Sequence, residues 1–189
     1  MQIGSFVALG DSFTEGLDDP RADPDVVAQS FDDLIRTLLM TGCQVVIFTG
    51  FDPRFPVLRL IRGRVAAYNM HLRAIAERHG CHVVDLWGMG VLRDPRAWSA
   101  DRLHLTPDAH RRVALRACEV MGVDVDEDWR EPWPATEDVT ASGRRAWLDA
   151  RRMDLQWARV HAAPWVARRV RGISSGDNID PKRPKLLPL

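Results

Sequence analysis

Short apolar runs alternate along the chain with segments in which apolar residues recur at helical spacing. The runs at 3–9, 43–49 and 82–87 are short and are each closed by glycine or a turn, which is typical of buried strands. The periodic segments at 24–41 and 61–79 predict two amphipathic helices. This order of strands and helices predicts an α/β fold with a parallel sheet and a ligand crevice at the carboxyl ends of the strands.

Capping residues mark where these helices begin and end. Asp23 followed by Pro24 is a start signal, and His79-Gly80 is a stop signal. Thr106-Pro107 opens a further helix that runs to Gly122, where we expect the compact unit to end.

Three regions follow from these boundaries. We predict an α/β domain over 1–122, a tryptophan- and arginine-rich helical extension over 123–171, and a disordered tail over 172–189. Pro164 is expected to interrupt the helix of the extension.

The composition changes this picture little. A chain of 189 residues with 46% hydrophobic residues can bury a core without disulfides or a structural metal. Cys43, Cys81 and Cys118 are too few and too scattered for a disulfide framework or a zinc site, and they suit a reducing compartment. No apolar run approaches the roughly 20 residues that span a bilayer, and the N-terminus has no cationic segment. We expect a cytoplasmic protein that holds no metal.

The formal net charge is zero, but the two signs are unevenly distributed. Residues 143–189 are strongly basic, and the preceding chain is acidic. We expect the extension to pack on the α/β unit through its tryptophans, which are Trp129, Trp133, Trp147, Trp157 and Trp165. The alternatives are a solvated arginine face and a basic amphipathic helix in weak contact with an acidic membrane or nucleic acid, although no nucleic-acid motif accompanies it.

A candidate nucleophile follows the first predicted strand. Gly10-Asp11-Ser12 stands directly after 3–9, at the position where α/β enzymes place reactive groups. A serine hydroxyl needs a base, a group that orients the base, and donors for the developing oxyanion. Alone, this tripeptide is more often a turn, so Ser12 is a candidate nucleophile only if the chain also supplies a base.

A candidate base and its orienting carboxylate stand together before the last helix. Asp101 and His104 are three residues apart, so both side chains can converge on one crevice. Alone, this spacing is more often a capped surface turn. The two segments follow the first and the last predicted strands, and the order of Ser12, Asp101 and His104 suits a catalytic triad.

Through these two segments the chain resembles the SGNH/GDSL hydrolase family. The resemblance rests on Val7–Gly16 and Asp101–Pro107, with support from Phe48–Pro53, and covers about residues 3–122.

The resemblance implies a role for each candidate residue. Ser12 would be the nucleophile and, through its backbone N–H, an oxyanion donor, while His104 would be the base that Asp101 orients. It also implies a flavodoxin-like three-layer α/β/α fold with a mainly parallel sheet, a small-molecule ester or acylated substrate, and no cofactor.

The chain departs from the family pattern between Gly16 and the helix at 24–41. The family has there a glycine whose N–H faces the oxyanion and a Gly-x-Asn-Asp segment whose asparagine does the same, and neither is present. The simplest interpretation is a deletion at about Pro20–Asp23 that reduces the number of strands. In a weaker alternative, Gly50-Phe51-Asp52 replaces the second segment and the Gly50 N–H donates to the oxyanion, although the Asp52 carboxylate would repel that charge.

Two classes of function remain open from the sequence. The first is a serine hydrolase that cleaves a small ester with Ser12, His104 and Asp101. The second is a catalytically impaired remnant of the same family that serves as a binding module.

Overall fold

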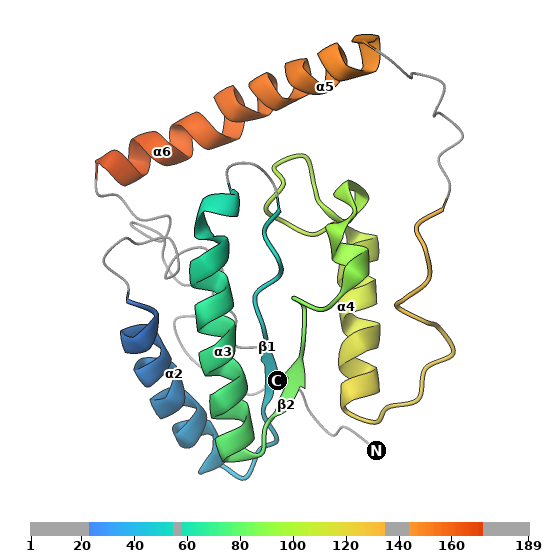
Figure 1. Ribbon diagram of the computed structural model, residues 1–189. Helices are drawn as coiled ribbons and strands as arrows, with labels where there is room; N and C mark the ends of the chain where they lie inside the picture. The colour runs from blue at the N-terminus through green and yellow to red at the C-terminus, as the bar shows by residue number, and fades with distance from the viewer. Residues whose placement is uncertain (1–22, 55–57, 135–143, 172–189) are drawn as a thin grey trace, which may run out of the picture. The chain divides into compact units, whose positions relative to one another are not determined.

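The structure, a computed structural model, describes residues 23–54, 58–134 and 144–171. The chain forms two compact units, Met1–Glu137 and Asp138–Leu189 (Figure 1). The predicted strand at 3–9, the Ser12 segment and the tail at 172–189 lie outside the described residues.

Two parallel strands form the sheet of the first unit, within the part of the chain described. β1 (Val46–Phe48) pairs with β2 (His82–Val84), with Ile47 opposite Val83. Between them the chain runs through a 3₁₀ turn, Leu58–Ile61, and the helix α3, Arg62–His79. The strand, helix, strand order with parallel pairing confirms the predicted α/β class. Both strands are shorter than predicted, and the three-layer arrangement stays a prediction.

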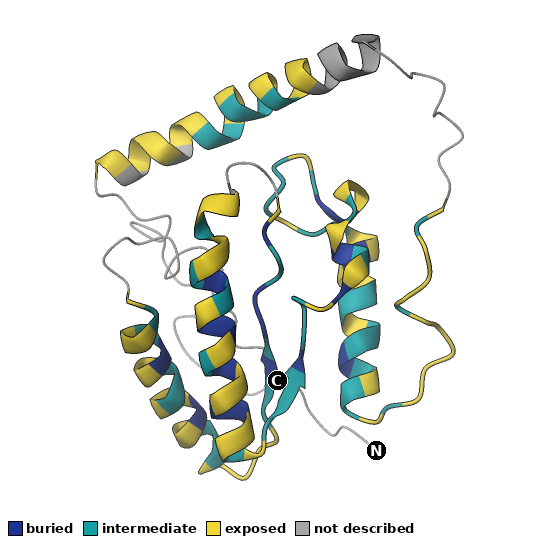
Figure 2. Cartoon of the chain, viewed as in Figure 1, coloured by how far each residue is buried: buried dark blue, intermediate teal, exposed yellow. Residues whose placement is uncertain are grey.

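A first core cluster joins α2 (Pro24–Leu39) to α3 and β1. Asp23 caps α2 as predicted, because its side chain accepts a hydrogen bond from the Asp25 N–H at 3.0 Å. Figure 2 shows that the buried positions of both helices lie on one face of each. The buried members of the cluster are apolar and are Ala28, Ile35, Ile47, Val65, Tyr68, Leu72, Ile75 and Ala76.

The carboxyl end of α3 is tied to α2 by charge. The helix ends at His79, as predicted, and Gly80 follows with a left-handed φ of 65°. Asp32 of α2 lies 2.8 Å from His79 Nε2 and 2.9 Å from Arg78 Nη1. The hydrogen bond from His79, with the charge of Arg78, holds the pKa of Asp32 below its usual value.

A second core cluster lies between β2 and α4 (Pro107–Val120). Thr106 caps α4 as predicted, because its hydroxyl accepts from the Ala109 N–H at 3.4 Å. The buried members of this cluster are Met89, Leu92, Ala97, Trp98 and Ala109. Both clusters therefore belong to the first unit and flank the strand pair.

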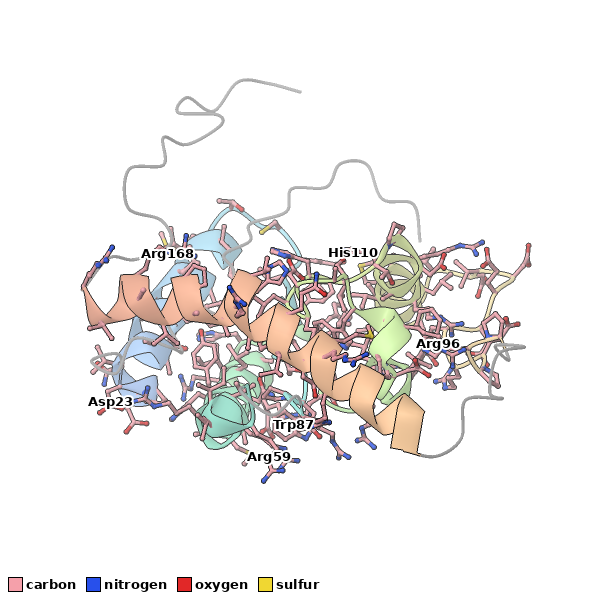
Figure 3. The ribbon with its side chains drawn as sticks, turned by 90° about the horizontal axis from the view of Figure 1, so that it is seen from above. Asp23, Arg59, Trp87, Arg96, His110 and Arg168 are labelled. Carbon is pink, nitrogen blue, oxygen red and sulfur yellow. The ribbon has the colours of Figure 1, made fainter. Side chains whose placement is uncertain are left out.

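Residues 123–134 follow α4 and pack on the second cluster; we call them the tryptophan strap. Trp129 and Trp133 are half-buried there. Trp133 donates from Nε1 to the Val91 carbonyl at 2.9 Å, and the guanidinium of Arg112 lies 4.5 Å from the Trp133 ring centre. Arg96, labelled in Figure 3, contacts the same ring at 5.9 Å. Trp129 and Trp133 therefore pack on the α/β unit, but the prediction of a helical extension beginning at 123 is wrong here, because 123–134 form no helix and belong to the first unit.

Glu119 of α4 binds the middle of the tryptophan strap. Trp129 Nε1 and Arg130 Nη2 each donate to its carboxylate at 2.6 Å. The hydrogen bonds from Arg130, Trp129 and Arg116 lower the pKa of Glu119 to about 2. This carboxylate therefore stays ionised well below the pH at which an ordinary glutamate is protonated.

A chain that ends at Gly122 is expected to be less stable than one that ends at Glu137. Truncating a fully buried tryptophan costs about 3–5 kcal/mol, so losing two half-buried ones should lower the free energy of unfolding by about 2–4 kcal/mol. Urea unfolding followed by circular dichroism measures this difference. Equal unfolding midpoints would contradict the stabilising role of the strap.

In the described part of the second unit, residues 144–171, the helices α5 (Arg144–Trp157) and α6 (Ala163–Val170) are joined by a π turn at Ala158–Ala162. The predicted interruption near Pro164 thus takes the form of a widened turn. Pro164 has no N–H to donate, and its ring would clash with the carbonyl four residues earlier in a regular helix, so the wider turn relieves both problems. Among the described helices, none is long and apolar enough to cross a membrane.

Candidate active site

The loop at 98–106, between a 3₁₀ turn and α4, carries the predicted base. An antiparallel bridge between Trp98 and Leu105 closes the loop. The Trp98 side chain anchors it, because Trp98 is only 8% exposed and its Nε1 donates to the Leu92 carbonyl at 2.8 Å. The loop is therefore fixed to the second core cluster.

Asp101 and His104 form the hydrogen-bonded pair that the sequence predicts. His104 Nδ1 lies 2.5 Å from Asp101 Oδ2, and Asp101 Oδ1 accepts from the backbone N–H groups of Leu103 and His104, both at 3.0 Å. The His104 side chain is 77% exposed. With Nδ1 held by the carboxylate, Nε2 is the nitrogen that can exchange a proton with a nucleophile.

Arg102, between the two partners, has a left-handed backbone with a φ of 58°. This conformation is uncommon for a residue other than glycine, asparagine or aspartate, and such outliers gather at functional sites. Here the Arg102 N–H donates to the Ser99 carbonyl at 2.9 Å. The turn that brings Asp101 back to His104 therefore requires an unusual backbone.

Asp101 carries a lowered pKa. Partial burial, the largest influence, raises it, but the hydrogen bonds from the His104 ring and from the Leu103 and His104 N–H groups outweigh burial. Because a lowered pKa favours the ionised form, Asp101 is a carboxylate at neutral pH. A carboxylate that orients a histidine and stabilises its imidazolium form has to be ionised.

A hydrogen bond joins the chain segments that leave the carboxyl ends of β1 and β2. Thr49 is fully buried, and its hydroxyl donates to Asp85 Oδ1 at 3.1 Å. Two residues after Thr49, the Phe51 ring lies 4.4 Å from the Trp98 ring, measured between ring centres. The chain leaving β1 and the His104 loop therefore meet at the carboxyl edge of the sheet, where the sequence predicts the crevice (Figure 1).

Gly50, the oxyanion donor of the weaker alternative, is hydrogen-bonded to an asparagine of α3. The Gly50 N–H donates to Asn69 Oδ1 at 2.7 Å, and Asn69 Nδ2 donates to the Gly50 carbonyl at 2.9 Å. A Cβ on residue 50 would lie 2.7 Å from Val65 Cγ1, so α3 approaches too closely for any side chain here. Because this N–H already donates to Asn69, we assign Gly50 no catalytic role.

The sequence places Asn69 in a helix but gives it no partner. The sequence does contain a signal for this pairing, since the Asn69 side-chain amide lies in the apolar stripe of Val65 and Leu72. A buried amide needs hydrogen-bond partners.

Replacing Asn69 with Ala is expected to lower the free energy of unfolding by about 2–5 kcal/mol, because it leaves a buried N–H and a buried carbonyl of Gly50 without partners. Met70→Ala is the matched control, since Met70 is the next residue of α3 and is 69% exposed. Its expected effect is within about 0.5 kcal/mol. Urea unfolding of both variants tests this, and equal midpoints would show that the pair contributes nothing.

Asp52 is paired with two arginines that the sequence does not single out. Its side chain is 3% exposed, with Arg54 Nε at 2.7 Å and Arg62 Nε at 2.5 Å. The hydrogen bond from Arg62, followed by that from Arg54, holds the pKa of Asp52 below its usual range against the effect of burial. Asp52, which the sequence predicts to repel an oxyanion, is therefore paired with two positive charges.

Ser12 lies outside the described residues, so its role stays a prediction.

Over the ranges that the structure covers, no three histidine, cysteine, aspartate or glutamate side chains gather as a metal site.

One of three comparisons with known proteins finds a match. Residues 19–112, about half of the chain, match the sequence model of the GDSL-like Lipase/Acylhydrolase family. The matched segment includes Asp101 and His104, and it begins after the Ser12 segment. No curated protein and no solved structure matches the chain significantly. The segment 19–112, which holds the strand pair and the paired aspartate and histidine, belongs to the GDSL-like lipase/acylhydrolase family.

Proposed function

We propose that the chain is a serine hydrolase that cleaves a small ester or acylated substrate with Ser12, His104 and Asp101. The observation that carries the proposal is the hydrogen-bonded Asp101–His104 pair on an anchored loop at the carboxyl edge of the sheet. The family match supports ester hydrolysis as the class of reaction.

The chemistry follows from the pair. Ser12 Oγ attacks the acyl carbon while His104 Nε2 accepts its proton, and the Asp101 carboxylate stabilises the imidazolium that forms. The imidazolium then returns the proton to the alcohol as the acyl–oxygen bond breaks. Water repeats these steps on the acyl-serine, which releases the acid and restores the serine.

The position of Ser12 fits this chemistry through the predicted topology. The serine follows the predicted strand 3–9, and a third strand parallel to β1 and β2 would end at the edge where His104 stands.

The alternative is a family member that binds an ester without cleaving it. The observation that favours it is the Gly50 N–H bond to Asn69, which uses a backbone donor near the edge that should stabilise the oxyanion.

Release of p-nitrophenolate from p-nitrophenyl acetate separates the two functions. The full chain should carry a Cys43→Ser change, because Cys43 is an exposed thiol that the ester can acylate. A hydrolase releases several equivalents of product per chain at a steady rate above that of buffer. Release that stops at or below one equivalent would support the binding module.

A further inference from the structure

The pair of arginines on Asp52 presents positive charge at the surface. The Asp52 side chain is 3% exposed, whereas those of Arg62 and Arg54 are 45% and 55% exposed. One buried carboxylate thus faces two exposed guanidinium groups. A ligand that approaches this position meets the cations and not the anion that holds them.

Arg62 stands where the 3₁₀ turn Leu58–Ile61 passes into α3. It is the first residue of α3, whose first turn contains no acidic residue and whose cap residue makes no side-chain hydrogen bond. Because the helical run begins at Leu58, the positive end of its dipole lies one turn before Arg62, and the acidic partner of Arg62 is Asp52.

The Arg62 guanidinium is held in one orientation. Nε and Nη2 contact the two carboxylate oxygens of Asp52 at 2.5 and 3.2 Å, and the guanidinium carbon lies 5.0 Å from the centre of the Trp87 ring, a residue labelled in Figure 3. A guanidinium has five N–H donors, and these two contacts use only part of them. Because Asp52 and Trp87 already order the side chain, binding a second anion costs less side-chain entropy.

One aromatic contact connects the chain segment of this cluster to the His104 loop. Asp52 follows Phe51, whose ring contacts Trp98 at the start of the His104 loop. The carboxylate that holds the arginine pair is therefore one residue along the chain from a contact with the His104 loop.

We infer that Arg54 and Arg62 form an anion-binding subsite, so that the preferred substrate is an ester that carries a carboxylate or phosphate group. That the bound anion is part of a substrate rests on the proposed hydrolase function. The anion-binding subsite itself is tested by binding alone.

Binding is measured on the full chain with Ser12→Ala, so that no ester is consumed. Methyl hydrogen succinate and dimethyl succinate differ by one negative charge, and methyl phosphate provides the phosphate probe. Titration calorimetry should show that both anionic probes bind more tightly than dimethyl succinate. Whichever of the two binds at the lower concentration identifies the charged group of the substrate.

Three variants on this background test the residues. Arg62→Gln should weaken binding of the anionic probe about 10- to 100-fold and leave dimethyl succinate unchanged. Arg62→Lys keeps the positive charge but loses the two-pronged guanidinium, so its affinity for the anionic probe should lie between those of the parent and Arg62→Gln. Arg78→Gln is the matched control, because Arg78 pairs with Asp32 at the other end of α3, 16 residues away. It should change nothing. Circular dichroism verifies that each variant is folded.

The outcomes separate this inference from the proposed function. If the anionic probes bind through Arg62 while the parent chain hydrolyses no ester, the subsite stands and the hydrolase proposal fails. If the parent chain hydrolyses esters but Arg62→Gln and Arg78→Gln bind the anionic probes equally well, the subsite is refuted and the hydrolase proposal stands.

Discussion

Replacing either Ser12 or His104 with alanine is expected to lower the rate of ester hydrolysis by about 10³-fold or more, and by a similar factor in each case. The nucleophile and its base act as one unit, so removing either removes the same chemical step. The double variant should therefore be no slower than either single variant. Steady-state hydrolysis of p-nitrophenyl acetate measures all three rates.

His110→Ala is the matched control for the base. His110 is an exposed histidine of α4, labelled in Figure 3, six residues after His104. Its loss should leave the rate unchanged. Asp101→Ala should lower the rate less than His104→Ala, because a base without its orienting carboxylate retains some activity. Equal rates for His104→Ala and His110→Ala would remove the histidine from the mechanism.

Helix boundaries were predictable because capping is a local property. Asp23, Gly80 and Thr106 each satisfy or terminate backbone hydrogen bonds within a few residues of their own position. The same holds for Asp101 and His104, whose pairing depends on a spacing of three residues within one turn.

The parts that escaped prediction depend on contacts distant in sequence. Gly50 and Asn69 are 19 residues apart, and their pairing exists only because α3 packs against the end of β1. Trp133 reaches the Val91 carbonyl across 42 residues. Strand length was overestimated for a related reason, since an apolar run shows where a strand lies but not how far its partner extends.

Restoring the two missing oxyanion segments is expected to raise the rate of hydrolysis by about 10⁴- to 10⁶-fold if the two donors contribute independently. Each oxyanion donor is worth about 10² to 10³ in rate, and in the chain as it stands we assign only the Ser12 backbone N–H to this role. The natural chain should accordingly be slow even with an activated ester. A family segment carrying both the glycine and the Gly-x-Asn-Asp sequence, inserted between Arg21 and Asp23, provides the test.

The control is the same insertion with its oxyanion asparagine replaced by alanine, which restores length but not that donor. It should lose about 10²-fold or more relative to the full insertion. If the natural chain turns over as fast as the full insertion, the missing segments are not needed and another group stabilises the oxyanion.

Reaction with a fluorophosphonate probe tests the central claim most directly, because only a serine activated by a neighbouring base is labelled readily. The full chain is treated with the probe, digested with trypsin and analysed by mass spectrometry; cleavage after Arg21 places Ser12 in the first peptide, together with Ser5. We predict one adduct, assigned to Ser12 by fragmentation, present in His110→Ala and absent in His104→Ala. An unlabelled chain, or an adduct that persists in His104→Ala, would contradict the assignment of Ser12, His104 and Asp101 as a catalytic triad.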